Sequence, residues 1–221
     1  SHLKDQNATS IKSENSDIET QKTAFEEEIS QGLEHQAAGR TDNAEDIYRS
    51  ILKENPDHVE AARLLAGIAM EHEKYRDAEI FLSRVAKNAP DYSRAWADLV
   101  KAQREQDKFS VAISSAEKLI QLDPKIAESY MVKASAEGMA GQNQAAIESY
   151  EIALKLAPNK AGAFCSMAHH LKTIGKQDEA VTAYRKAINI KPDHTESYWS
   201  LANLKTFSFL DEEISAMKAL I

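Results

Sequence analysis

The two side chains best suited to chemistry in this sequence are Cys165 and His169, which lie four residues apart. Residues at this spacing share one face of a helix, so the thiol and the imidazole could meet. Such a pair could be a cysteine nucleophile with its base, or half of a metal site. No third partner stands at a useful spacing, so ordinary packing is the favoured interpretation of both residues. We therefore predict no catalytic residue, no metal ligand and no cofactor-binding residue in this chain.

The composition of the chain favours one fold class and argues against several kinds of partner. The 221 residues include only seven glycines and five prolines, which favours an all-α fold. The net charge of −8 argues against nucleic acid as a partner, because nucleic-acid binding needs a basic surface. No apolar run approaches the roughly 18 residues that span a bilayer, so no membrane partner is expected. A single cysteine excludes an internal disulfide and fits a reducing compartment, which predicts a cytoplasmic location.

The prolines reveal how the chain is organised, because each lies 34 residues from the next. They are Pro56, Pro90, Pro124, Pro158 and Pro192. An alanine stands twelve residues before each of them, at Ala44, Ala78, Ala112, Ala146 and Ala180. Between prolines, two amphipathic stretches are joined by a turn, as in residues 161–194, where Gly175 can end the first helix. A small residue at a fixed position indicates a close approach of two helices in every repeat.

With this 34-residue helix–turn–helix period, the chain resembles the tetratricopeptide repeat (TPR) family from about Phe25 to its end. The resemblance implies a right-handed α-solenoid of five repeats, at residues 25–58, 59–92, 93–126, 127–160 and 161–194. Residues 1–24 are expected to form a polar, partly helical segment, with a helix from about residue 17. Residues 195–221 are expected to form an unpaired sixth first-helix and a capping helix, sealed by Ile214, Met217, Leu220 and Ile221.

Four positions depart from the family pattern. Glu28 and Gln31 stand where the first repeat would usually have a bulky aromatic residue and a leucine. Glu73 replaces the glycine of a turn, and Lys133 stands where the family usually has leucine, which leaves the packing around it in doubt.

The resemblance also implies a groove along the first helices of the repeats, where a partner would bind. Its expected residues comprise a basic set, Arg63, Arg94, Lys101 and Arg104, and a mixed set, Met131, Val132, Ser135, Cys165, His169, Trp199 and Asn203. These sets favour an extended ligand that is acidic toward the second and third repeats and apolar toward the fifth and sixth. Two alternatives stay open. The basic set could be a solvated face balanced by Glu60, Asp98 and Glu105, and Trp199 could pack on the C-terminal helix.

The C-terminal run has a narrower resemblance, to the junction between the TPR array and the catalytic domain of bacterial TPR-containing sulfotransferases. Residues 198–206 and the helix start at Asp211-Glu212-Glu213-Ile214 show this likeness. A catalytic domain of that family would bind 3′-phosphoadenosine 5′-phosphosulfate through a loop rich in glycine and serine. No such loop occurs in this chain, so the resemblance implies that the chain is the interaction region alone.

The sequence therefore predicts a scaffold that binds a protein or peptide and has no catalysis of its own. Its leading version is the N-terminal interaction region of a sulfotransferase whose catalytic domain is not in this chain. One alternative is a free-standing TPR adaptor. Another is an enzyme that uses Cys165 and His169, which an unreactive, buried thiol would dismiss.

Overall fold

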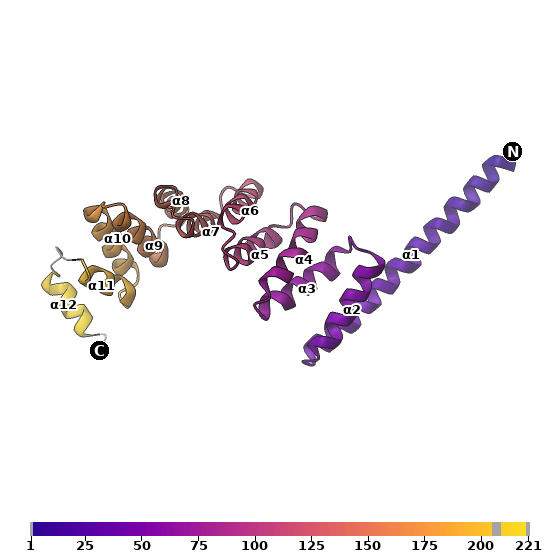
Figure 1. The fold of residues 1–221 in the computed structure, drawn as a ribbon, viewed down its shortest axis with the longest axis horizontal. Helices are drawn as coiled ribbons and strands as arrows, with labels where there is room; N and C mark the ends of the chain where they lie inside the picture. Colours follow the sequence, from indigo (N-terminus) through magenta and orange to yellow (C-terminus); the bar gives the residue numbers. More distant parts are fainter. Residues whose placement is uncertain (1, 205–208, 220–221) are drawn as a thin grey trace. The chain divides into compact units, whose positions relative to one another are not determined.

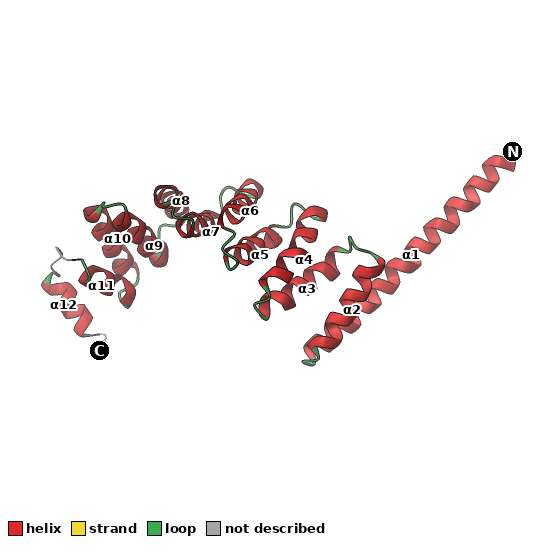
Figure 2. Cartoon of the chain, in the orientation of Figure 1, coloured by secondary structure: helices red, strands yellow, loops and turns green. Residues whose placement is uncertain are grey.

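The structure, a computed structural model, describes residues 2–204 and 209–219, with side chains described from residue 19 onward. These residues form twelve α-helices and no β-strand (Figure 1, Figure 2). The helices are α1 (His2–Ala37), α2 (Thr41–Glu54), α3 (Val59–Glu71), α4 (Tyr75–Asn88), α5 (Ser93–Arg104), α6 (Phe109–Leu122), α7 (Ala127–Met139), α8 (Asn143–Leu156), α9 (Ala161–Thr173), α10 (Gln177–Ile190), α11 (Thr195–Ala202) and α12 (Asp211–Lys218). The all-α prediction is confirmed.

The chain divides into two compact units, Ser1–Ala95 and Trp96–Ile221. In the first unit, α1 packs on α2 and α3 packs on α4. The two hairpins contact each other through α2 and α3. In the second unit, α7 packs on α8 and α9 packs on α10, with α6 against α7, α8 against α9, and α10 against α11. Each unit is thus a stack of helical hairpins, in which a hairpin buries its apolar faces against the next one.

The turn inside each hairpin has the same backbone conformation. Five residues at 34-residue intervals adopt a left-handed φ: Gly39 at 74°, Glu73 at 56°, Asp107 at 58°, Gly141 at 76° and Gly175 at 83°. The amide of the following residue donates to the carbonyl five residues earlier, as in Gln142 N to Glu137 O at 2.9 Å. This pattern is the Schellman motif, which satisfies carbonyls at the end of a helix. Glu73 therefore replaces glycine without changing the turn.

The regularly spaced prolines end the second helix of each hairpin. Helices α2, α4, α6, α8 and α10 all stop two residues before a proline. The residue between them leaves the helical region, as Asn55 does with φ −129° and ψ 90°. Proline imposes this, because its ring disfavours helical geometry in the preceding residue. The predicted helix ends are therefore confirmed.

The repeated alanine position lies in the core of every hairpin. Ala44, Ala78, Ala112, Ala146 and Ala180 are all fully buried. Four residues later, the larger Tyr48 and Tyr184 are also fully buried, and Tyr150 nearly so. The tyrosine rings fill the space beside the alanine contacts and extend the core toward the next hairpin.

The predicted packing doubt at Lys133 has a polar solution. Lys133 Nζ lies 3.6 Å from the Glu137 carboxylate and 3.2 Å from that of Glu117. Ser149 on α8 also donates a hydrogen bond of 2.7 Å to the buried Glu137. One repeat earlier, the equivalent pair is Ser115 and Gln103, joined at 2.8 Å. Buried polar groups require such partners. Lys133, at the position where the family usually has leucine, is accommodated because the carboxylates of Glu117 and Glu137 lie beside its ammonium group.

The N-terminal helix is longer than predicted, because α1 begins at His2 and not near residue 17. No proline or glycine occurs before Gly32, so nothing in this stretch stops a helix once it has formed. Burial begins only at Phe25, whose ring meets the His58 ring edge-on at 5.4 Å. The described side chains of residues 19–24 are exposed.

The helix start predicted at Asp211 is confirmed. Glu213 accepts a hydrogen bond of 2.8 Å from the Leu210 amide and pairs with Arg185 of α10 at 2.8 Å. Phe209 and Met217 pack against the apolar core of the last hairpin. Ile214 is more exposed than predicted, and Leu220 and Ile221 lie outside the described residues, as do residues 205–208. The segment from Phe209 to Met217, which includes most of α12, therefore covers the last hairpin through one ion pair and two apolar side chains.

The left-handed turn at Glu73 yields a first prediction. A non-glycine residue there costs about 1–2 kcal/mol of strain, and glycine would relieve it at a cost of about 0.4–1 kcal/mol in unfolded-chain entropy. We expect Glu73→Gly to stabilise the first unit by up to about 1 kcal/mol, measured as a higher midpoint of thermal unfolding. Gly141→Ala, the reverse change at the equivalent turn, should lower the midpoint. A lower midpoint for Glu73→Gly would contradict this account.

Two helical glycines yield a second prediction. An added Cβ at Gly32 would overlap the ring of Tyr48, which is fully buried and cannot move aside. Gly67, also in a helix, has no atom within 4 Å of an added Cβ. We expect Gly32→Ala to cost about 1–3 kcal/mol through overpacking. Gly67→Ala should instead gain about 0.5–1 kcal/mol through helix propensity. Urea unfolding measures both, and equal effects at the two positions would be inconsistent with the packing of α1 on α2.

Candidate functional site

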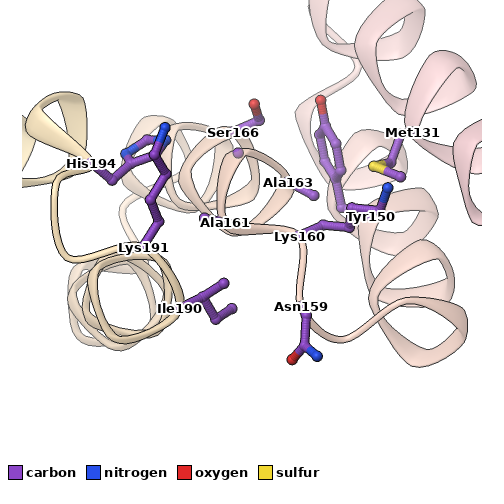
Figure 3. A pocket seen from close by; sticks show the side chains of 11 residues that line it. Met131, Tyr150, Asn159, Lys160, Ala161, Ala163, Ser166, Ile190, Lys191 and His194 are labelled. Atoms are coloured by element: carbon purple, nitrogen blue, oxygen red, sulfur yellow. The ribbon is translucent and has the colours of Figure 1, made fainter.

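The second unit has a cleft of about 770 Å³ (Figure 3). Its residues come from α7 and α8, from the start of α9, from the end of α10, and from the two loops that precede α9 and α11. They are Met131, Tyr150, Asn159, Lys160, Ala161, Gly162, Ala163, Ser166, Ile190, Lys191 and His194. The cleft therefore lies between the fourth and fifth hairpins.

Small residues at the start of α9 make room for the cleft. In Figure 3, Met131 and Tyr150 stand on one side of Ala161 and Ala163, and Lys191 and His194 stand on the other. Gly162 has no atom within 4 Å of an added Cβ, so its position is open space. A larger side chain at position 162 would extend into this volume. Ala161 and Ala163, which also line the cleft, are themselves buried.

The walls of the cleft combine positive charge with apolar surface. Lys191 is exposed, and Lys160 Nζ lies 2.7 Å from the carboxylate of Glu128. The hydrogen bond from Lys160 lowers the pKa of Glu128, which favours the carboxylate form of Glu128. Burial raises the pKa of Tyr150, whose phenol is therefore neutral and able to donate a hydrogen bond. A ligand with a carboxylate beside an apolar group matches this set of side chains.

Of the residues predicted for the groove, Met131 lines this cleft. The structure also brings together Arg104 and Ser135, joined by a hydrogen bond of 3.0 Å. Val132 is half-buried against the core of α5, α6 and α7 and offers less surface than predicted. Met131 is therefore the one predicted groove residue that is described as lining the cleft.

The basic set divides between the two units, since Arg63 and Arg94 belong to the first and Lys101 and Arg104 to the second. Arg63 is held by Glu60 through two hydrogen bonds of 2.8 and 2.6 Å. Arg94 and Lys101 are exposed. Arg63 thus has the acidic partner that the solvated-face alternative expects, and a joint basic surface made by all four residues stays a prediction.

Trp199 is 71% exposed, which is unusual for tryptophan, the largest of the twenty amino-acid side chains. The alternative in which it packs on α12 is therefore not observed. The exposed Asn203, at the end of α11, donates a hydrogen bond of 3.0 Å to the Trp199 carbonyl. Trp199 remains available to a partner, as predicted for a groove residue.

Cys165 and His169 do share a face of α9, with Sγ and Nε2 3.8 Å apart. The expectation that they lack a third partner is wrong, because Glu196 of α11 brings a carboxylate oxygen to 3.9 Å from His169 Nε2. Ser200 Oγ lies 3.1 Å from the same nitrogen. The repeat period could have indicated this partner. The position 34 residues after Cys165 is 199, and Glu196 lies three residues before it, at the start of the next first-helix. Sequence reasoning compared residues along one helix only.

The same geometry argues against a cysteine nucleophile. Cys165 is only 2% exposed, and burial raises the pKa of its thiol. Burial also lowers the pKa of His169, so the imidazole is neutral at pH 7. A reactive thiolate requires the opposite conditions, namely access and a nearby positive charge. Cys165 also offers little surface to a ligand in the predicted groove.

The cleft was missed because the sequence analysis considered only positions on the first helices. Lys160, Lys191 and His194 lie in or beside the loops between hairpins, where the proline period gives no clue to which residues face inward. The one available signal was the run of small residues at 161–163 that follows a lysine.

Comparisons with known proteins agree with the repeated hairpins. Two tetratricopeptide repeat models match residues 35–103 and 97–161, and a TPR repeat model matches residues 168–205. No curated protein matches the chain in sequence. Among the described helices, none combines the length and the apolar character that crossing a membrane requires.

Solved structures show the same fold. A crystal structure of MamA is 25% identical, with a TM-score of 0.68 over 75% of this chain and 96% of MamA. MamA 41-end from Desulfovibrio magneticus RS-1 is 14% identical, with a TM-score of 0.69 over 77% of this chain and 96% of its own. YrrB, described as a TPR protein with an unusual peptide-binding site, is 16% identical, with a TM-score of 0.72 over 81% of this chain and 96% of YrrB. The chain is therefore an all-α solenoid of tetratricopeptide repeats.

Proposed function

We propose that this chain is a non-catalytic scaffold that binds an extended peptide or a segment of a partner protein in the cleft beside α9. The observation that supports it is the 770 Å³ hollow, which has the size of a ligand pocket and mixes apolar walls with a few polar groups. The likeness to YrrB is consistent with peptide binding in a repeat fold, since YrrB is described as having an unusual peptide-binding site.

The chemistry of the cleft suggests which peptide would bind. Lys191 would attract a carboxylate, and the Tyr150 hydroxyl would donate a hydrogen bond to a peptide oxygen. Met131 and Ile190 would contact an apolar side chain nearby. The proposed ligand is therefore an extended segment with an acidic residue next to an apolar one. Trp199, exposed on α11, is a second candidate anchor for the same partner.

The sulfotransferase parent is a finer proposal, and it rests on the C-terminal run alone. All three family models that match the chain describe TPR repeats, and the model at residues 168–205 includes the first part of that run, up to Lys205, but not the helix start at Asp211. A free-standing adaptor explains the same helices without a catalytic domain. Both versions propose the same cleft and the same cytoplasmic location, so the binding test below applies to either.

Filling the cleft should abolish peptide binding. Peptides selected from a random display library against the parent chain serve as the ligands. We expect Gly162→Leu, which adds a side chain to open space, to weaken their binding at least about tenfold in isothermal titration. Gly67→Leu in the first unit is the matched control, because Gly67 is also helical with open space around it. The control should keep the parent affinity.

Charge reversal separates attraction from packing. Lys191→Glu should weaken the selected acidic peptides mainly at low salt, because an exposed charge acts on the association rate. Peptides that bind the parent, Gly162→Leu and Lys191→Glu equally well would show that the cleft is not the binding surface. The peptide affinity of Trp199→Ala would then show whether the exposed face of α11 is the binding surface.

A further inference from the structure

Three donor atoms of different chemistry meet between α9 and α11. Cys165 Sγ, His169 Nε2 and a carboxylate oxygen of Glu196 all lie within 4.8 Å of one another. Two of the separations are 3.8 Å, between Sγ and Nε2, and 3.9 Å, between Nε2 and the carboxylate oxygen. Two donors come from successive turns of one helix and the third comes from the next repeat. The repeat geometry thus assembles a site that neither helix contains alone.

These distances are close to those of a zinc site. Zinc binds thiolate at about 2.3 Å and imidazole or carboxylate at about 2.0–2.2 Å, which in a tetrahedron separates the donors by roughly 3.4–3.6 Å. The two separations of 3.8 and 3.9 Å exceed these values by a few tenths of an ångström, and the third, between Sγ and the carboxylate oxygen, is within 4.8 Å. Glu196 can shorten the two separations that involve its carboxylate, because its side chain is 63% exposed. The donor set also suits zinc, which accepts sulfur, nitrogen and oxygen ligands together.

A buried tyrosine packs beside the donors. The Tyr184 ring lies 5.5 Å from the His169 ring, centroid to centroid, and its hydroxyl is buried with Ser200 as a hydrogen-bonding neighbour. Tyr184 therefore forms part of the wall of this cluster and is not one of its donors.

We propose that Cys165, His169 and Glu196 bind one Zn²⁺ ion, with the fourth position open to water or to a group from a partner. The Cys165 S–H bond gives its proton to solvent as the sulfur–zinc bond forms, and no electron is transferred. Thiolate and carboxylate then balance the two charges of the ion. The ion would join α9 to α11 and so hold the sixth first-helix against the last complete hairpin. This inference does not depend on peptide binding in the cleft.

The charged and titratable groups that face His169 are Glu196, Lys172 and His194. Zinc binds cysteine as the thiolate and histidine as the neutral imidazole, so metal binding must remove the proton of the Cys165 thiol. Metal binding should therefore release a proton and strengthen as pH rises.

Cobalt(II) is the probe, because its bond to a thiolate produces a charge-transfer absorption band in the near ultraviolet. The chain has a single cysteine, so any such band comes from Cys165. Titration of the full chain with Co²⁺ should give this band at one ion per chain, and Zn²⁺ should remove it by displacement. Calorimetry with Zn²⁺ in buffers of different ionisation enthalpy should report the single released proton.

Three variants and a control test the ligands. Cys165→Ser should abolish the band, while His169→Gln and Glu196→Gln should each weaken Co²⁺ binding at least about tenfold, since even indirect partners of a metal matter by 10–100-fold. His170→Gln, on the same helix but bonded to Asn143, should bind as the parent does. Glu196 is exposed, so its variant keeps the fold even if the buried substitutions do not.

Three outcomes would overturn the site. The first is the lack of a thiolate band with millimolar Co²⁺. The second is a band of parent strength in both His169→Gln and Glu196→Gln, which would mean a thiol bound alone. The third is metal binding without a thiolate band, which would come from surface histidines.

Discussion

The close approach of two helices at a buried alanine is the constraint on which this structure depends. Ala44, Ala78, Ala112, Ala146 and Ala180 have no exposed surface, and a larger side chain at any of them would separate the helices of its hairpin. That approach sets where the tyrosines four residues later lie and how far each hairpin reaches toward its neighbour. The cleft beside α9 and the donor cluster of Cys165, His169 and Glu196 both form between neighbouring repeats, so both inherit their geometry from the alanine contacts.

The sequence was sufficient to predict the features that repeat. Prolines end helices, and glycines or left-handed substitutes turn hairpins, through local backbone physics that is the same in every repeat. The buried alanines follow from the same period. The extent of α1 was underestimated, because polar composition was taken as a sign of a tail, although helix propensity needs no apolar residues to continue a helix.

Features that arise between repeats were not predictable in the same way. The cleft depends on the space that Gly162 leaves and on loop residues whose direction no periodicity specifies. Glu196 reaches His169 from 27 positions further along the chain, so only the packing of α11 beside α9 brings them together. Trp199 was assigned to the surface by family geometry, and its exposure agrees. The sequence of this chain indicates only the chemistry that a partner would have. It identifies neither that partner nor a longer parent protein.

The hydrogen-bonded pairs inside the third and fourth hairpins have a consequence for how the chain folds. Helices of similar repeats can dock on the wrong partner, because their apolar faces are alike. At the positions of Glu137 and Ser149, the fifth repeat has Leu171 and Ala183, and the second has Ala69 and Phe81. If α10 or α4 docked on α7, the buried Glu137 would lose the hydrogen bond from Ser149 and keep only Lys133 as a partner, which costs more than a lost apolar contact. The polar pairs therefore disfavour docking of the second helices of the second and fifth repeats onto α7.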